Sequence, residues 1–232
     1  MDNSENNSNT ESTARGAIIE FDFTAINGAE MLFEAAKAIL APKGVELGVK
    51  LEAKYLAGNN AQSAIAELFN ANSVVDDPAA AARDLTAAFA AAATEAMPGA
   101  FTPGFVAFVK GLAEKGLKVV LSTRGDTERL AKLVEERIGS PLVVAYSEPS
   151  TTYGSCKWDA WRRAATQNGL ADVFTAAITG SGYGVKSALV ANLAVAAIEN
   201  PHTAYQDFGG ADIVAEKFDA ALAKDVLAML HL

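Results

Sequence analysis

The sequence predicts an α/β protein with a doubly wound, Rossmann-like parallel sheet and an all-helical domain inserted after the first strand. Short apolar runs rich in Val, Ile, Leu and Ala alternate with helical stretches along most of the 232 residues. The runs lack strict apolar–polar alternation, which is typical of parallel strands buried on both faces. About ninety residues between the first and second runs carry only helical patterns, which predicts the insertion.

The first strand is expected at 17–24, where an apolar run leads into Glu20, Asp22 and Thr24. Residues two apart point the same way along a strand, so Glu20 and Asp22 are expected to share one site. Paired carboxylates at the end of an α/β strand indicate metal, phosphoryl or acid–base chemistry. An edge strand with two ordinary solvated acids explains the spacing equally well.

The later elements repeat the strand–helix order that produces right-handed βαβ units. Glycine and proline breaks separate them, as in the segment Gly139-Ser140-Pro141. The expected strands are 117–121, 142–146, 173–179, 193–198 and 211–214, and the expected helices between them are 104–115, 127–138 and 157–168.

The insertion is expected to contain four helices, at 28–40, 46–56, 60–69 and 78–97. The turn residues Gly58-Asn59-Asn60 and Asp76-Asp77-Pro78 separate them and provide helix caps. The predicted organisation is a tail at 1–15, a core domain formed by 16–26 and 98–232, and a cap domain at 27–97. Because ligands bind at the carboxyl edge of such sheets, the cap is a candidate lid.

Composition excludes several classes of function. The net charge is −9 with scattered Lys and Arg, which argues against a nucleic-acid surface or a membrane-binding face. Residues 1–15 lack the apolar core of a signal peptide, and the apolar segment 79–97 contains three charged residues and reads as a packed helix. A cytoplasmic protein is expected. Its one cysteine and two late histidines exclude a disulfide within the chain and a histidine-rich metal site.

From residue 16 onward the chain resembles the haloacid dehalogenase superfamily of phosphohydrolases, in the subgroup with a helical cap after the first strand. The motif segments appear in the family's order. They are Glu20-Phe21-Asp22-Phe23-Thr24, the cap exit from Met97-Pro98-Gly99, the strand ending in Ser122-Thr123, Lys157 at the start of a helix, and the strand that leads into Thr179-Gly180.

The resemblance implies a role for each matching position. In working members the first acid of the first motif is the nucleophile, here Glu20, and the second is the general acid and base, here Asp22. The phosphoryl group would lie against Thr24, Ser122, Thr123, Lys157, Gly180 and Ser181. Acids of the first and fourth motifs would bind Mg²⁺, and charge neutralisation by Mg²⁺ and lysine suits phosphoryl transfer. The implied partner is a small phosphorylated or anionic molecule.

The chain departs from this pattern at both acidic motifs. Glu20 replaces the aspartate nucleophile and places its carboxylate on the order of 1.5 Å farther out. This displacement is expected to impair attack, because a ~1 Å error can cost on the order of 100-fold in rate. In the fourth motif Ser181 stands where the first acid belongs, and Val185 or Lys186 where the second belongs. Only Glu20 and Asp22 remain as metal ligands, so weak Mg²⁺ binding or none is predicted.

Several of these residues have two interpretations. The Lys186 ammonium either replaces the missing metal and pairs with Glu20 and Asp22, or points to solvent. Ser122 and Thr123 either bind phosphate or cap the following helix. The substitutions favour a homologue that has lost or weakened its phosphatase activity and has a non-catalytic ligand-binding or interaction role. The alternative is an active Mg²⁺-dependent hydrolase of a small phosphorylated metabolite that uses Glu20 and Asp22.

Overall fold

The computed structural model describes residues 14–147 and 158–232, and its centre is a six-stranded, fully parallel sheet with the strand order β3-β2-β1-β4-β5-β6. This arrangement confirms the predicted α/β fold with a doubly wound sheet. The strands are β1 Gly16–Glu20, β2 Lys118–Thr123, β3 Val143–Ser147, β4 Thr175–Thr179, β5 Ala194–Ile198 and β6 Ile213–Ala215.

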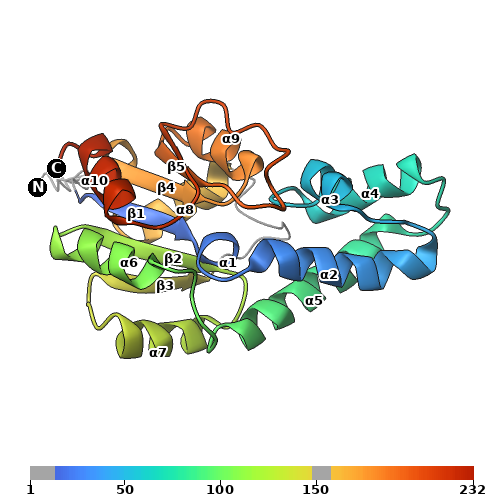
Figure 1. Cartoon of the computed structure of the whole chain (residues 1–232), viewed down its shortest axis with the longest axis horizontal. Coiled ribbons are helices and arrows are strands. Elements are labelled where there is room, and N and C mark those ends of the chain that lie inside the picture. The colour runs from blue at the N-terminus through green and yellow to red at the C-terminus, as the bar shows by residue number, and fades with distance from the viewer. Residues whose placement is uncertain (1–13, 148–157) are drawn as a thin grey trace, which may run out of the picture.

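Helices cover both faces of the sheet, which explains why the strands are apolar throughout (Figure 1). Along β1, Ile19 packs with one helical layer and Ile18 with the other. The first layer contains α6 Phe105–Glu114, α7 Thr127–Arg137 and α10 Ala220–Met229, and the second contains α8 Trp158–Gln167 and α9 Gly182–Val190.

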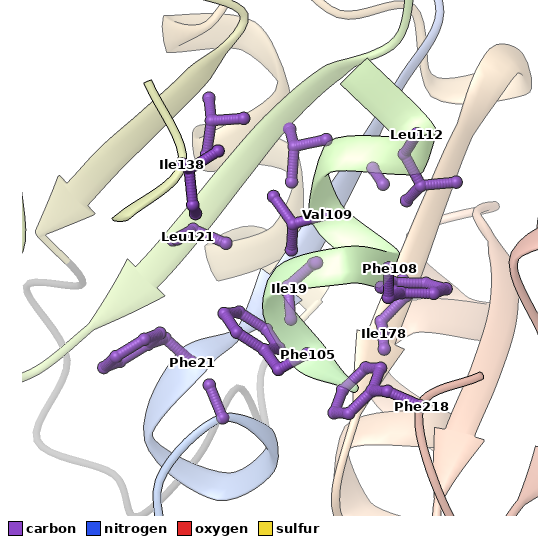
Figure 2. Packing of buried hydrophobic residues seen from close by; sticks show 14 of the residues in the cluster. Ile19, Phe21, Phe105, Phe108, Val109, Leu112, Leu121, Ile138, Ile178 and Phe218 are labelled. Atoms are coloured by element: carbon purple, nitrogen blue, oxygen red, sulfur yellow. The ribbon is translucent and has the colours of Figure 1, made fainter. Parts of the chain in front are cut away.

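An aromatic group anchors the first layer directly behind the end of β1. Phe105 of α6 lies within 6 Å, between ring centroids, of Phe21, Phe101 and Phe218, at steep angles. Figure 2 shows Phe21, Phe105 and Phe218 beside labelled aliphatic residues of the same cluster, among them Ile19 of β1 and Leu121 of β2. This packing fixes the backbone at the residue that follows Glu20.

The residues between the first and second strands form the helical cap that the sequence predicts, beside the carboxyl edge of the sheet (Figure 1). Its helices share a separate apolar cluster that includes Leu32, Ile65 and Phe89. Asn60 and Asp77 cap two of them, as their turn positions predict, by accepting backbone N–H bonds from Ser63 and Ala79. The elements are α2 Gly28–Leu40, η1 Ala41–Lys43, α3 Val49–Tyr55, α4 Ala61–Ala71 and α5 Pro78–Ala96.

Several expected elements differ in their bounds from the observed ones. Residues 172–174 form a 3-10 turn, η2 Asp172–Phe174, before β4 starts, and the last strand lies later than expected, at Ile213–Ala215. The helix expected at 46–56 starts only at Val49, after the extended Gly48. None of the helices in the described parts of the chain is long and apolar enough to cross a membrane.

Candidate functional site

The first strand ends at Glu20, and the helical turn α1 Phe21–Thr24 follows at once. The expected strand at 17–24 is therefore too long by four residues, and the argument that Glu20 and Asp22 point the same way along one strand is wrong. The turn closes locally, because the Thr24 hydroxyl donates a hydrogen bond to the Glu20 carbonyl over 2.8 Å. Thr24 thus serves the backbone of the turn.

Glu20 lies in the closed interior at the carboxyl edge of the sheet, with 1% of its surface exposed. Its Oε2 accepts a hydrogen bond of 2.6 Å from the Thr179 hydroxyl and one of 3.3 Å from the Gly180 N–H. Both donors stand at the end of β4, the neighbour of β1. The Glu20 carboxylate therefore ties the ends of two adjacent strands together.

Asp22 makes the equivalent connection on the other side of β1, to the end of β2. Its Oδ1 accepts a 2.6 Å bond from the Thr123 hydroxyl, and its Oδ2 accepts a 2.8 Å bond from the Arg124 N–H. Burial raises the pKa of the Asp22 carboxyl, while the charge of Arg124 and these hydrogen bonds oppose the rise. Asp22 is fully buried.

Three of the predicted phosphate ligands are Ser122, Thr123 and Lys157. Thr123 is engaged with Asp22 and also accepts the Gly125 N–H, whereas Ser122 is a buried strand residue paired in register with Glu20. Thr123 does not cap α7, since Asp126 performs that role. Lys157 lies outside the described residues.

Gly180 and Ser181 serve the start of α9. The Ser181 hydroxyl caps the helix by accepting the Gly184 N–H at 3.0 Å. Ser181 is fully buried, because the cap loop at Gly58 lies directly on it. A Cβ atom added to Gly58 would be 2.2 Å from the Ser181 Oγ. The cap therefore fills the space in front of the fourth motif.

The structure places Lys186 away from the two buried acids. Its side chain is 59% exposed, and its ammonium lies 3.4 Å from the carboxylate of Asp207, which is also exposed. The idea that Lys186 pairs with Glu20 and Asp22 is therefore wrong, and the solvent-facing alternative is correct. The physical reason is that Lys186 lies on the outward side of α9, whereas Gly184 and Val185 face inward.

The described residues do not fit a Mg²⁺ site. Mg²⁺ requires several oxygen ligands in octahedral geometry, but Asp22 and Glu20 are directed to different strands, Asp22 to the end of β2 and Glu20 to the end of β4. The Ser181 hydroxyl is engaged as a helix cap. In residues 14–147 and 158–232, no three His, Cys, Asp or Glu side chains form a group that could hold a metal ion.

Sequence reasoning missed Thr179 as a partner of Glu20 and Gly58 as the residue that covers Ser181. Thr179 could have been identified from the sequence, because a polar residue at the end of a buried strand adjoins the carboxyl edge of the sheet. Gly58 could not have been identified in this way, since its contact with Ser181 depends on how the cap is placed against the core.

Replacing Gly58 by alanine is expected to destabilise the protein more than the same change at Gly44. Both glycines have left-handed backbones, with φ of 80° and 83°, so each change carries strain of about 1–2 kcal/mol. Only at Gly58 does the new Cβ also collide with Ser181, whereas at Gly44 nothing lies within 4 Å. Thermal unfolding of both variants measures the difference, and equal losses in Tm would contradict the tight contact between cap and core.

Solved structures provide the comparison with known proteins, since no family model matches the chain and no curated protein matches its sequence. β-Phosphoglucomutase from Clostridium difficile has a TM-score of 0.68 at 14% identity, covering 95% of this chain and 100% of that one. CbbY from Rhodobacter sphaeroides, in complex with phosphate, has 0.64 at 18%, covering 95% and 100%. A haloacid dehalogenase-like protein from Agrobacterium tumefaciens has 0.66 at 15%, covering 94% and 100%.

These similarities extend over almost the whole of each chain, and they therefore include both the parallel sheet and the inserted helices. Identity below 20% fixes the architecture and leaves the chemistry to the site residues of this chain. The chain thus has the haloacid dehalogenase-like fold, with a helical cap inserted after the first strand.

Proposed function

We propose that this protein is a non-catalytic relative of the haloacid dehalogenase-type phosphohydrolases, which retains their fold for a binding or interaction role. The observation that carries the proposal is the engagement of Glu20. The carboxylate at the nucleophile position accepts hydrogen bonds from Thr179 and Gly180 in the protein interior. It acts as a connection between β1 and β4.

The chemistry of a carboxylate nucleophile supports this proposal. Attack on phosphorus requires an oxygen that can reach the phosphoryl group in line, and a ~1 Å misplacement costs on the order of 100-fold in rate. Glu20 is one methylene longer than aspartate, and its Oε2 points to the end of β4. A substrate would have to displace these two hydrogen bonds before reaching it.

The second half of the site has also changed its role. Ser181, which stands at the position of the expected acid, caps α9 and lies under Gly58 of the cap. The charge near Asp22 comes from the Arg124 side chain. An arginine beside the surviving acid supplies the positive charge that a divalent cation would otherwise supply.

A second candidate, a slow Mg²⁺-dependent hydrolase of a small phosphorylated metabolite, is favoured by one observation. Burial raises the pKa of Asp22, and a carboxyl group with a raised pKa is suited to general acid catalysis near neutral pH. The phosphate complex of the similar CbbY structure supports a small anionic ligand for either candidate. Measuring the hydrolysis of a generic phosphate ester distinguishes the non-catalytic protein from the slow hydrolase.

We expect no hydrolysis of an aryl phosphate above background when the purified protein is supplied with Mg²⁺. The reason is that both carboxylates serve as hydrogen-bond acceptors for the strand ends. Release of the phenolate at micromolar protein measures the rate, and Glu20→Gln is the matched control, because it keeps the size of the side chain. Mg²⁺-dependent turnover in the wild type that disappears in Glu20→Gln would establish the hydrolase instead.

A further inference from the structure

The cap and the core are joined by a set of polar contacts outside the motif positions. Gln206, in the loop after β5, donates from Nε2 to the carbonyls of Ala53 and Ala57, over 2.6 and 2.8 Å. Its Oε1 accepts the Gly182 N–H at 2.7 Å. The Tyr183 hydroxyl donates to the Lys54 carbonyl at 2.9 Å. The core thus satisfies the carbonyls at the end of α3 that the helix itself leaves without partners.

One contact in this seam, the boundary between the helical cap and the core, joins two titratable groups. Glu52 of α3 is fully buried, and its Oε2 lies 3.4 Å from Nδ1 of His202, in the core loop between β5 and β6. Neither oxygen of Glu52 nor Nδ1 of His202 has a hydrogen-bond partner among the described residues. Phe33 of α2 covers the imidazole, with ring centroids 5.3 Å apart.

The state of these two atoms depends on a single proton. When one proton lies between the Glu52 oxygen and Nδ1, one atom donates and the other accepts, so both buried groups are satisfied. When that proton is lost, the neutral imidazole still carries one ring proton, which it can place on Nδ1. The Glu52 carboxylate is then a charge in an apolar surrounding, and its Oε1 has no hydrogen-bond partner among the described residues. Loss of one proton therefore weakens the closed state, because the Glu52 carboxylate must then be buried as a charge.

The elements around this contact carry further charged side chains, most of which have partners of their own. Glu199 begins the core loop, directly after β5. The remaining pairs are Glu30 with Asn27 and Glu34 with Lys37 on α2, Lys50 over the Tyr205 ring and Lys54 over the Tyr55 ring on α3, and Lys186 with Asp207 and Asp212 with the Val195 N–H in the core.

We propose that Glu52 and His202 form a one-proton latch that holds the helical cap on the core and weakens as the pH rises. The latch concerns the closed state of the cap and does not depend on whether the motif residues catalyse a reaction. It rests on the proposed binding role and adds a regulated element to it, because the cap loop at Gly58 lies on Ser181, one of the residues predicted to contact a phosphoryl group.

The sign of the pH dependence follows from the burial of Glu52. Burial raises the pKa of this carboxyl from an ordinary value of 4.5 to about 8 in the closed state. When the cap is released, the carboxyl meets water and returns toward 4.5. Between these two pH values the closed state binds one more proton, so its stability is fully present below the lower value and declines until the upper value is reached.

Hydrogen exchange of the α3 amides between pH 5 and pH 9 tests the latch. After correction for the intrinsic exchange rate, the protection of α3 in the wild type is expected to fall by up to about tenfold per pH unit until about pH 8. Amides of β1 report global unfolding and serve as the internal reference. Glu52→Gln is expected to abolish the decline, because its amide stays neutral and donates to Nδ1.

Glu46→Gln, which removes an exposed acid shortly before α3, is the matched control and is expected to retain the wild-type decline. The latch is overturned if Glu52→Gln declines as the wild type does. It is also overturned if α3 and β1 exchange in one common event with the same pH dependence, since Glu52 would then affect only global stability. The readout contains no catalytic step, so its outcome is separate from that of the phosphatase assay.

Discussion

Replacing Glu20 by aspartate, the residue of the resembling motif, is expected to destabilise the protein by about 2–4 kcal/mol and not to restore phosphatase activity. The shorter side chain withdraws its carboxylate by on the order of 1.5 Å, which breaks the bonds from Thr179 and Gly180. Both donors are then left buried without their acceptor. Urea unfolding of the variant measures the loss, and an aryl phosphate assay with Mg²⁺ measures activity.

The matched control is Glu216→Asp, the same chemical change at an exposed position after β6. A surface substitution of this kind is expected to stay within about 0.5 kcal/mol of the wild type. If Glu20→Asp were as stable as this control and hydrolysed the substrate, the site would still be able to catalyse hydrolysis, and the structural role of Glu20 would be contradicted. Loss of stability without activity supports the structural role.

The largest loss of stability is expected for Phe105→Ala, at about 3–5 kcal/mol. Phe105 is fully buried, and its ring lies against Phe21, Phe101 and Phe218. Its removal leaves a cavity directly behind the turn that places Asp22. Scanning calorimetry measures the effect, which corresponds to a decrease in Tm on the order of 10 °C for a chain of this size.

Val75→Ala, a truncation at a fully exposed apolar residue, is the control for Phe105→Ala and is expected to leave Tm nearly unchanged. A small effect at Phe105 would mean that the aromatic group is loosely packed or relaxes into the cavity. In that case the position of the α1 turn would depend on its own hydrogen bonds and not on the core behind it.

Much of the architecture was predictable because strand and helix patterns are local. The buried strands read as continuous apolar runs, and turn residues such as Asn60 and Asp77 cap helices through bonds to residues two or three positions away. The errors lie where local patterns end. The sequence around Asp22 is compatible with a strand, but the chain turns at Glu20 because the Phe21 ring enters the aromatic group behind β1.

Long-range contacts decided the roles of the site residues. The partners of Asp22 lie more than a hundred positions away, as the 2.6 Å bond from Thr123 shows. Lys186 looked able to reach the acids, yet the orientation of α9 directs it to Asp207. No spacing rule connects Gly58 with Ser181, because the contact is created when the cap closes.

By itself the sequence determined the fold class and the inserted cap, because the periodicity of apolar residues is a property of the chain. Only the tertiary structure decided what the polar residues do. It showed that Glu20 ties β1 to β4, that Ser181 caps a helix under the cap loop, and that Glu52 meets His202 across the seam. Burial and hydrogen-bond partners arise only when distant segments are packed together, and they set the chemistry of a carboxylate.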